Sequence, residues 1–168
     1  MRNPTLLILV VLAILIGVLI GMVAADKSIA AGSPWKPDFV TRVIDGDTYV
    51  LEQLGTVRVI GVDTPETRGR NDQPCFTRGW GVRAREYADG LVGLRNVRYR
   101  FERDRRDRYG RWLVHLRVGR RGVGARLLME GLAREESYSP NTARRSYYRR
   151  LQREAVGRGE GVWRSCRP

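Results

Sequence analysis

The sequence predicts an α+β protein in which a small antiparallel β-barrel carries helices packed against it. Two observations support this class. Apolar, β-branched segments with turn residues between them come first in the globular part, over residues 40–62. Segments with a helical spacing of apolar residues appear later, between and after further strands. This order differs from the regular alternation of strand and helix that builds a parallel sheet.

The first predicted strands are joined by two turns. Asp45-Gly46 lies between apolar, β-branched segments, which is typical of a hairpin. A second turn is predicted at Leu54-Gly55, followed by a strand over residues 56–62. Two more strands are predicted over residues 97–101 and 112–118.

Three helices are predicted from apolar residues that recur at helical spacing. The third is expected to begin near residues 141–142 and to end between residues 157 and 159. The predicted apolar faces consist of Trp80, Ala84, Tyr87 and Leu91 in the first helix, Val123, Leu127 and Leu128 in the second, and Tyr147, Leu151 and Ala155 in the third.

Residues 5–25 carry no charged side chain. As a helix this run spans roughly 30 Å, the thickness of one hydrocarbon core. A buried core helix is the alternative, but the rest of the chain is small, polar and basic. The run is longer than a typical signal-peptide core, so we expect residues 1–25 to form a transmembrane anchor, with a signal cleaved near Ala25 or Ala31 as the alternative. Arg2 places the N-terminus in the cytoplasm and the bulk of the chain outside.

Residues 26–37 are small, polar and proline-containing, which predicts a linker to a domain over residues 38–168. The net charge is +13, from 31 Lys and Arg against 18 Asp and Glu. A surface this basic attracts polyanions such as nucleic acid. Charge alone is equally compatible with a solubilising surface or with attraction to anionic lipid.

Four acidic residues fall at turns or strand ends of this basic chain: Asp45, Asp47, Asp63 and Glu66. Carboxylates that meet a backbone carbonyl suit a hard divalent cation such as Ca²⁺ or Mg²⁺. Asp is also a common turn residue, so each Asp alone has a structural explanation. The chain has one His and no Cys/His cluster, which argues against a zinc site.

Two arginines have unusual sequence surroundings. Arg58 interrupts an otherwise apolar strand, so it needs an anionic partner or a path to solvent. Arg111 begins another predicted strand. The planar guanidinium forms bidentate hydrogen bonds to phosphate and stays protonated. For any single arginine of this chain, a surface role is the alternative.

Three segments together resemble the active-site segments of the staphylococcal nuclease, or thermonuclease, family. They are VIDGDT at residues 43–48, VRVIGVDTPET at residues 57–67 and DRYGR at residues 107–111. Their order and approximate spacing also resemble the family, and the resemblance continues to residue 165. It implies a five-stranded, OB-like Greek-key barrel with three helices, here preceded by one N-terminal transmembrane helix.

The resemblance implies a calcium site next to a base. Asp47 and Asp63 match the calcium-ligating carboxylates, and Thr64 matches the residue that supplies a backbone carbonyl. Asp45 is expected near the metal without binding it. Ca²⁺ would polarise the phosphate and position a water that attacks phosphorus. Glu66 matches the acid that accepts the proton of this water or orients it.

The resemblance also implies phosphate and nucleotide contacts. Arg58 and Arg111 match the two arginines that stabilise the charged transition state. Arg108 and Tyr109 match positions near the terminal phosphate of a bound nucleotide, and Tyr138 is close to a tyrosine-bearing loop. The implied reaction is cleavage of DNA and RNA with little sequence specificity and with 3′-phosphate ends.

Some features depart from the family pattern. Residues 68–78 do not match its mobile loop, and they contain Cys75. An extracytoplasmic location permits a bond between Cys75 and Cys166, which would stabilise the fold by roughly 4–5 kcal/mol, and two free thiols are the alternative. The lone His115 matches no catalytic position, so we expect a structural role for it.

Two other classes of protein fit part of these observations. A catalytically silent module that binds nucleic acid or another polyanion would need the basic surface, but not the full set of acids and arginines. A structural protein that holds envelope polymers or lipid would have no use for the acids. We expect a monomer without protein partners.

Overall fold

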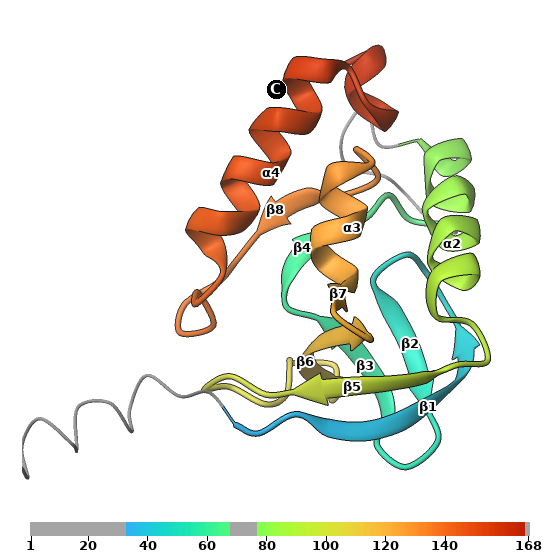
Figure 1. Ribbon diagram of the computed structural model, residues 1–168, viewed down its shortest axis with the longest axis vertical. Helices are drawn as coiled ribbons and strands as arrows, with labels where there is room; N and C mark the ends of the chain where they lie inside the picture. The colour runs from blue at the N-terminus through green and yellow to red at the C-terminus, as the bar shows by residue number, and fades with distance from the viewer. Residues whose placement is uncertain (1–32, 68–76, 167–168) are drawn as a thin grey trace, which may run out of the picture. The chain divides into compact units, whose positions relative to one another are not determined.

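The computed structural model describes residues 33–67 and 77–166. Five strands of this part form a closed barrel: β1 (Lys36–Val43), β2 (Thr48–Leu51), β3 (Gly55–Val59), β5 (Asn96–Arg100) and β6 (Trp112–Val118). Neighbours in the order β3-β2-β1-β5-β6 pair antiparallel, and a parallel pairing of β3 with β6 closes the barrel (Figure 1). The predicted barrel and both predicted turns are confirmed.

The chain leaves the barrel directly after β3. A short strand β4 (Gly61–Asp63) follows and pairs antiparallel with β8 (Arg134–Glu136) in a second, two-stranded sheet. The prediction of one continuous strand over residues 56–62 is therefore wrong. Gly61 has a φ of +82°, a backbone conformation that favours glycine, and it breaks the strand there. β7 (Arg121–Gly122) extends β6 through a hairpin.

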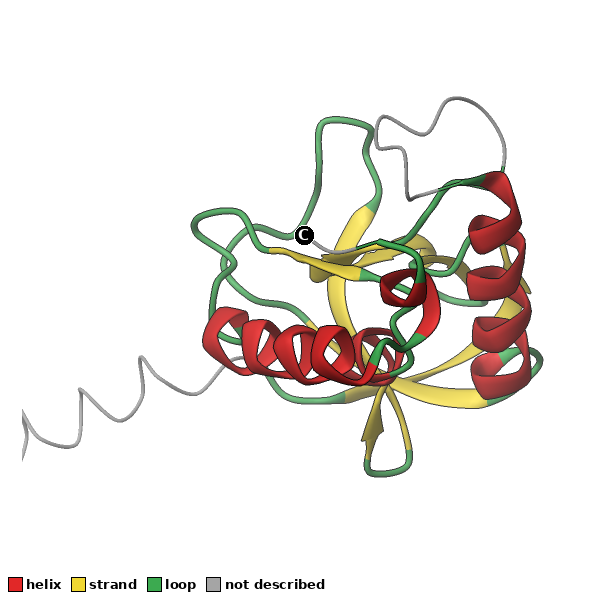
Figure 2. Cartoon of the chain, turned by 90° about the horizontal axis from the view of Figure 1, so that it is seen from above, coloured by secondary structure: helices red, strands yellow, loops and turns green. Residues whose placement is uncertain are grey.

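Three helices in the described residues cover the barrel: α2 (Arg78–Val92), α3 (Val123–Met129) and α4 (Arg145–Arg158). α3 contacts α2, α4 and β6, and in Figure 1 it lies between the other two helices. Seen from above in Figure 2, α2 and α4 lie on different sides of the barrel strands. A 3-10 helix η1 (Gly161–Arg164) packs against α4. The three predicted helices are confirmed.

The buried face of α4 differs from the prediction by one residue. Tyr148, Leu151 and Ala155 are buried, whereas Tyr147 is 40% exposed. The ring of Tyr148 lies against Gly61, which leaves no room for a side chain at that position. α4 begins at Arg145, later than expected, and it ends at Arg158, where Gly159 follows in the left-handed conformation common after helices.

The main hydrophobic core fills the barrel and the space beneath the helices. It includes Tyr49 and Leu116 from the strands and Leu127 and Leu128 from α3, each almost fully buried. His115 is also buried, and its Nε2 lies 2.5 Å from Oε1 of Glu102. Burial lowers the pKa of His115, so the ring stays neutral near pH 7. This is a structural position on β6, where His115 is buried beside Glu102.

The N-terminal predictions fall mostly outside the described residues. β1 begins at Lys36, so the last two residues of the predicted linker, 36 and 37, belong to the barrel. The predicted membrane segment, residues 5–25, lies outside the described part. Within residues 33–67 and 77–166, no helix has the length and apolar character needed to cross a membrane.

Of the two cysteines in the predicted disulfide, only Cys166 lies in the described residues. Cys166 is disulfide-bonded. Cys75 lies outside the described residues, so the pairing of Cys75 with Cys166 stays a prediction.

Candidate active site

A cleft of about 940 Å³ lies where the end of β3 and β4 face two loops, residues 104–111 and 138–141. The cleft combines both signs of charge with aromatic rings. Its lining includes three predicted arginines, two predicted acids and both predicted tyrosines: Arg58, Arg108, Arg111, Asp63, Glu66, Tyr109 and Tyr138.

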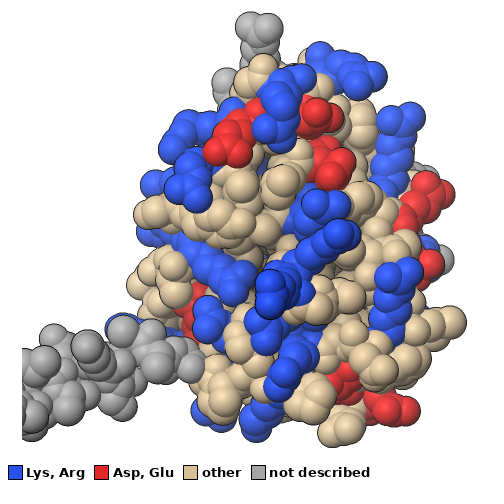
Figure 3. Space-filling view, viewed as in Figure 1, with Lys and Arg blue, Asp and Glu red and all other residues tan. Residues whose placement is uncertain are grey.

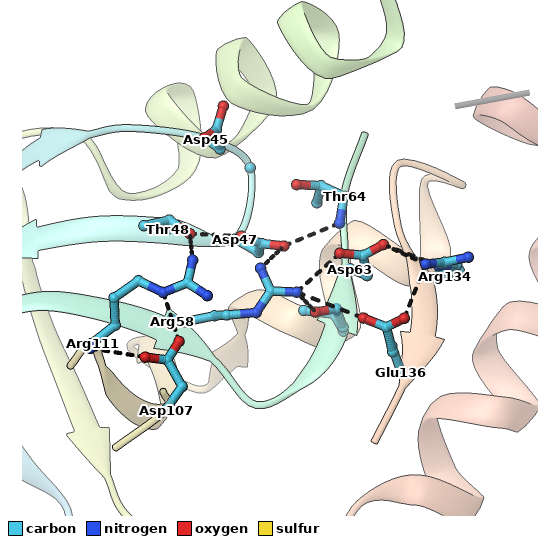
Figure 4. A network of polar contacts seen from close by, with 12 residues as sticks. Asp45, Asp47, Thr48, Arg58, Asp63, Thr64, Asp107, Arg111, Arg134 and Glu136 are labelled. Carbon is cyan, nitrogen blue, oxygen red and sulfur yellow. Dashed lines mark hydrogen bonds and ion pairs between the residues drawn. The ribbon is translucent and has the colours of Figure 1, made fainter. Parts of the chain in front are cut away.

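Arg58 is the centre of the polar network in this cleft. Its Nη1 lies 2.7 Å from Oδ2 of Asp47, and its Nη2 lies 2.9 Å from Oδ1 of Asp63 (Figure 4). The side chain is only 17% exposed. Burial alone would lower the pKa of Arg58, but Asp47 and Asp63 outweigh burial and raise it. The anionic partner that the sequence required for Arg58 is thus a pair of carboxylates.

Asp47 joins the first hairpin to the segment after β4. It is 3% exposed, and it accepts hydrogen bonds from Oγ1 of Thr48 at 2.8 Å and from the N–H of Thr64 at 3.1 Å. Burial raises the pKa of Asp47, and the positive charge of Arg58 opposes that shift. The carboxylate is therefore held in one orientation, directed toward Arg58.

Asp63 is held from its other side by residues that the sequence analysis missed. The register of β4 with β8 places Arg134 opposite Asp63, and Nε and Nη2 of Arg134 each lie 3.0 Å from Oδ2 of Asp63. Arg134 also pairs with Glu136 at 2.9 Å, and Glu136 lies 3.8 Å from Arg58. The mixed charges of REE at residues 134–136 were the available signal.

Arg111 is fixed by its own loop. Its Nε lies 2.7 Å from Oδ2 of Asp107, whose Oδ1 accepts the backbone N–H groups of Tyr109 and Arg111. Burial would raise the pKa of Asp107, but the bonds from Arg111 outweigh it and lower that pKa. Nη1 of Arg111 lies 3.5 Å from the Thr48 hydroxyl, so one chain of contacts joins Arg111 to Asp47.

The remaining predicted residues lie at the rim or behind the network. Tyr109 and Tyr138 are 68% and 69% exposed, and Arg108 donates to the Tyr109 hydroxyl at 2.7 Å. Glu66 is exposed at the edge of the cleft. Asp45 binds the backbone and hydroxyl of Thr67, and Figure 4 shows it apart from the Arg58 network.

The donor set of this network suits a hard cation. All of the candidate ligands are oxygens, and the guanidinium of Arg58 lies between the carboxylates of Asp47 and Asp63, where it supplies positive charge to both. Burial and the charges of Asp45, Asp47 and Asp63 raise the pKa of Glu66, and a cation would relieve that accumulation of negative charge. In the described residues, no group of three or more His, Cys, Asp or Glu side chains is arranged to hold a metal ion. A cation bound at these carboxylates would compete with Arg58 for them.

Two glycines let α2 approach the acidic segments. A Cβ at Gly81 would lie 2.3 Å from the carbonyl oxygen of Glu66, and a Cβ at Gly46 would lie 2.9 Å from the Cβ of Ala84 and 2.8 Å from a methyl group of Thr64. These close contacts fix the backbone of Glu66 against the helix. Gly46 thus allows the close packing, and Asp47 directly after it supplies the carboxylate that pairs with Arg58.

Replacing Gly81 by alanine is expected to lower the turnover number by about tenfold or more. The added methyl group meets the backbone of Glu66, which must shift, and a misplacement of about 1 Å can cost a factor of about 100 in rate. Gly90→Ala in the same helix is the matched control, because a Cβ there meets nothing within 4 Å. Alanine should stabilise that position by about 0.5–1 kcal/mol without changing turnover. Equal turnover in both variants would show that this contact does not position Glu66.

The fold and the cleft define a class of protein before any comparison. A closed five-stranded barrel covered by helices is an OB-like α+β architecture, and its cleft presents arginines, among them Arg58 and Arg111, beside clustered carboxylates, a set suited to phosphate esters. Residues 56–165 match the family described as Staphylococcal nuclease homologue. The chain therefore belongs to the staphylococcal nuclease family and is a hydrolytic nuclease.

Curated relatives agree with this assignment. The thermonuclease of Staphylococcus intermedius is 35% identical over 127 residues, which cover 74% of each chain. The thermonuclease of Staphylococcus hyicus is 33% identical over 127 residues, or 74% of this chain and 73% of the relative. Endonuclease YncB of Bacillus subtilis (strain 168) is 38% identical over 127 residues, or 73% of this chain and 59% of the relative.

Proposed function

We propose that this nuclease hydrolyses phosphodiester bonds of DNA and RNA in the presence of Ca²⁺, with little sequence specificity and with 3′-phosphate products. The observation that supports this most directly is the position of Arg58 between Asp47 and Asp63 in a cleft that also holds Arg111. Positive groups for the phosphate and carboxylates for a cation thus meet in one place.

The cation would be held by Asp47, Asp63 and the backbone carbonyl of Thr64. When bound, Ca²⁺ supplies Lewis-acid polarisation of a phosphate oxygen and orients a water. Asp47 is held for this role by Thr48 and by the Thr64 N–H. Arg134 orients Asp63 in the same way through its bonds to Oδ2.

Side chains of the protein accept the proton of the attacking water and stabilise the negative charge of the phosphate. Glu66, at the edge of the cleft, accepts the proton of the attacking water or orients that water. Arg58, once released by a carboxylate, and Arg111 donate to the phosphate oxygens, whose negative charge grows in the transition state. Asp107 keeps Arg111 in place during this step.

Exposed groups at the rim would bind the rest of the nucleotide. Arg108 and Tyr109 lie together on one loop, and Tyr138 lies on the other. Aromatic stacking and phosphate contacts tolerate any base, which accounts for the proposed lack of sequence specificity.

The proposed location is outside the cytoplasm, on a membrane anchor formed by residues 5–25. Support comes from the apolar run and from Arg2 before it. Release after signal cleavage near Ala25 or Ala31 is the alternative, and the N-terminal residue of the mature protein decides between them. We also propose that the protein acts as a monomer.

The deciding experiment compares the detergent-solubilised full chain with an Arg58→Ala Arg111→Ala variant on single-stranded DNA. Cleavage is expected in millimolar Ca²⁺, and it should disappear with chelator and in the variant. End-labelling of the fragments tests for 3′-phosphates. Tight binding of the DNA by the wild type without cleavage in any divalent metal would favour the silent binding module instead.

A further inference from the structure

Three arginines surround the indole ring of Trp35, outside the cleft. The guanidinium carbons of Arg117, Arg100 and Arg144 lie 4.2, 5.0 and 5.9 Å from the ring centroid. They come from β6, from β5 and from the residue directly before α4. We call these four residues the Trp35 cluster. None of the three arginines forms an ion pair with a carboxylate of the described residues, so this cluster concentrates positive charge.

This crowding of like charges is costly for the fold. Arg117 is paired across the strands with Arg98, and like charges directly opposite each other in a sheet destabilise it. Burial and the charges of Arg144 and Arg117 lower the pKa of Arg100, and the charge of nearby Glu102 opposes that shift without outweighing it. The Nε atoms of Arg100 and Arg117 are buried and have no hydrogen-bond partner among the described residues. An anion lying on the cluster would offset the crowding of like charges, because a phosphate neutralises positive charge, although it would not reach the buried Nε atoms.

Arginine–aromatic contacts continue from the cluster to the cleft. Phe101 follows Arg100, and the guanidinium carbon of Arg105 lies 5.3 Å from the centroid of its ring. Phe101 is 5.4 Å from Trp112, centroid to centroid, and Arg106 covers Trp112 at 3.7 Å. Arg106 itself lines the cleft. Phe101 is itself buried, whereas Arg105 and Arg106 are exposed. Exposed arginines therefore continue from the end of β5 to the cleft, and we call this stretch the path to the proposed site of hydrolysis.

We infer that the Trp35 cluster and this path bind the phosphate backbone of a single nucleic-acid strand, beyond the nucleotide that is cleaved. The inference rests on the proposed function, because the strand is the nuclease's own substrate. Stacked guanidiniums keep their N–H edges for bidentate bonds to phosphate. Figure 3 shows Lys and Arg side chains in a band across one face of the molecule, with few acidic side chains in the middle of that band.

The geometry favours a strand over an anionic membrane surface. A flexible strand can follow the path from the cluster into a concave cleft, whereas a bilayer surface cannot enter it. Two acids along the path are already engaged, Glu102 with His115 and Asp107 with Arg111. Asp104 lies exposed at the cleft margin, and its carboxylate limits how closely a phosphate approaches that point.

The test compares two substrates in three proteins, all as full chains in detergent. The substrates are a dinucleotide ester and a single-stranded DNA of about 16 nucleotides, long enough to occupy an extended site. The proteins are wild type, Arg100→Gln Arg117→Gln, and the matched control Arg85→Gln Arg153→Gln. The control removes the same charge from exposed positions on α2 and α4 whose arginines do not stack on any aromatic ring of the described residues. Thermal unfolding checks that all three fold.

For the long strand, the cluster variant is expected to raise KM about tenfold and to reduce the slope of log KM against log salt by about 1.4, the value for two lost phosphate contacts on single strands. The dinucleotide should be cleaved equally by all three proteins. An unchanged KM for the long strand, or an equal rise in the control, would overturn the inference. The inference would also fail if the cluster variant bound phosphatidylserine vesicles more weakly than the wild type and showed no other difference. Failure of the wild type to cleave even the dinucleotide in Ca²⁺ would instead refute the proposed function.

Discussion

Replacing Arg58 by alanine should abolish cleavage and also destabilise the folded protein. Arg58 neutralises both Asp47 and Asp63, and Asp47 is almost completely buried. Removing one partner of a buried ion pair leaves an uncompensated charge and costs about 3–5 kcal/mol. Loss of a group that stabilises the transition-state charge lowers turnover by a factor of about 100–1000. Urea unfolding and turnover measurements test the two effects separately.

Calcium should affect this variant more than the wild type. Without Arg58, the carboxylates of Asp47 and Asp63 no longer have a competing cation, so Ca²⁺ should raise the melting temperature of Arg58→Ala more strongly. Arg149→Ala is the control, since the side chain of Arg149 is 59% exposed, and ion pairs of exposed arginines contribute about 1 kcal/mol or less. The interpretation fails if Arg58→Ala loses no more stability than Arg149→Ala, or if Ca²⁺ stabilises it less than the wild type.

Replacing Glu66 by glutamine should reduce turnover by a factor of about 100–10,000 while the fold stays intact. Loss of a general base typically has an effect of this size. Glu66 is exposed, and substitutions at exposed positions usually change stability by about 0.5 kcal/mol or less. Turnover in saturating Ca²⁺ and calcium binding by calorimetry separate a lost base from a lost ligand.

A matched substitution on α2 controls for the loss of one negative charge. Glu86→Gln changes an exposed carboxylate that does not line the cleft, and it should leave turnover unchanged. Wild-type turnover in Glu66→Gln would remove Glu66 from the mechanism. An equal loss in Glu86→Gln would point to net charge as the cause.

Apolar patterns predicted the strands and helices of the fold. The errors in these predictions have local physical causes. The strand over residues 112–118 and the three helices were found because a repeating apolar face is a property of the sequence itself. The break at Gly61 was missed because the apolar pattern continues through it, although the backbone changes direction there. Tyr147 was chosen over Tyr148 because both fit a helical face, and only the packing against Gly61 distinguishes them.

The candidate site was predictable where residues are close in the sequence, and less so where they meet through folding. The resemblance located Asp47, Asp63 and Arg111, and the apolar surroundings of Arg58 required an anionic partner. They did not show whether that partner is phosphate or carboxylate. Arg134 was missed because its contact with Asp63 depends on the pairing of β4 with β8, two strands that are far apart in the sequence.

The closure of the barrel has a consequence for the newly made chain. β3 pairs with β6 through residues 57–59 and 112–114, so the barrel cannot close before β6 has left the ribosome. Arg111 directly precedes β6, and Arg134 comes later still. Contacts between distant segments also form slowly. An incomplete chain therefore has the residues of the first hairpin but no assembled site. The proposed cleavage of RNA could thus reach the messenger on which the protein is translated only after nearly the whole domain has emerged.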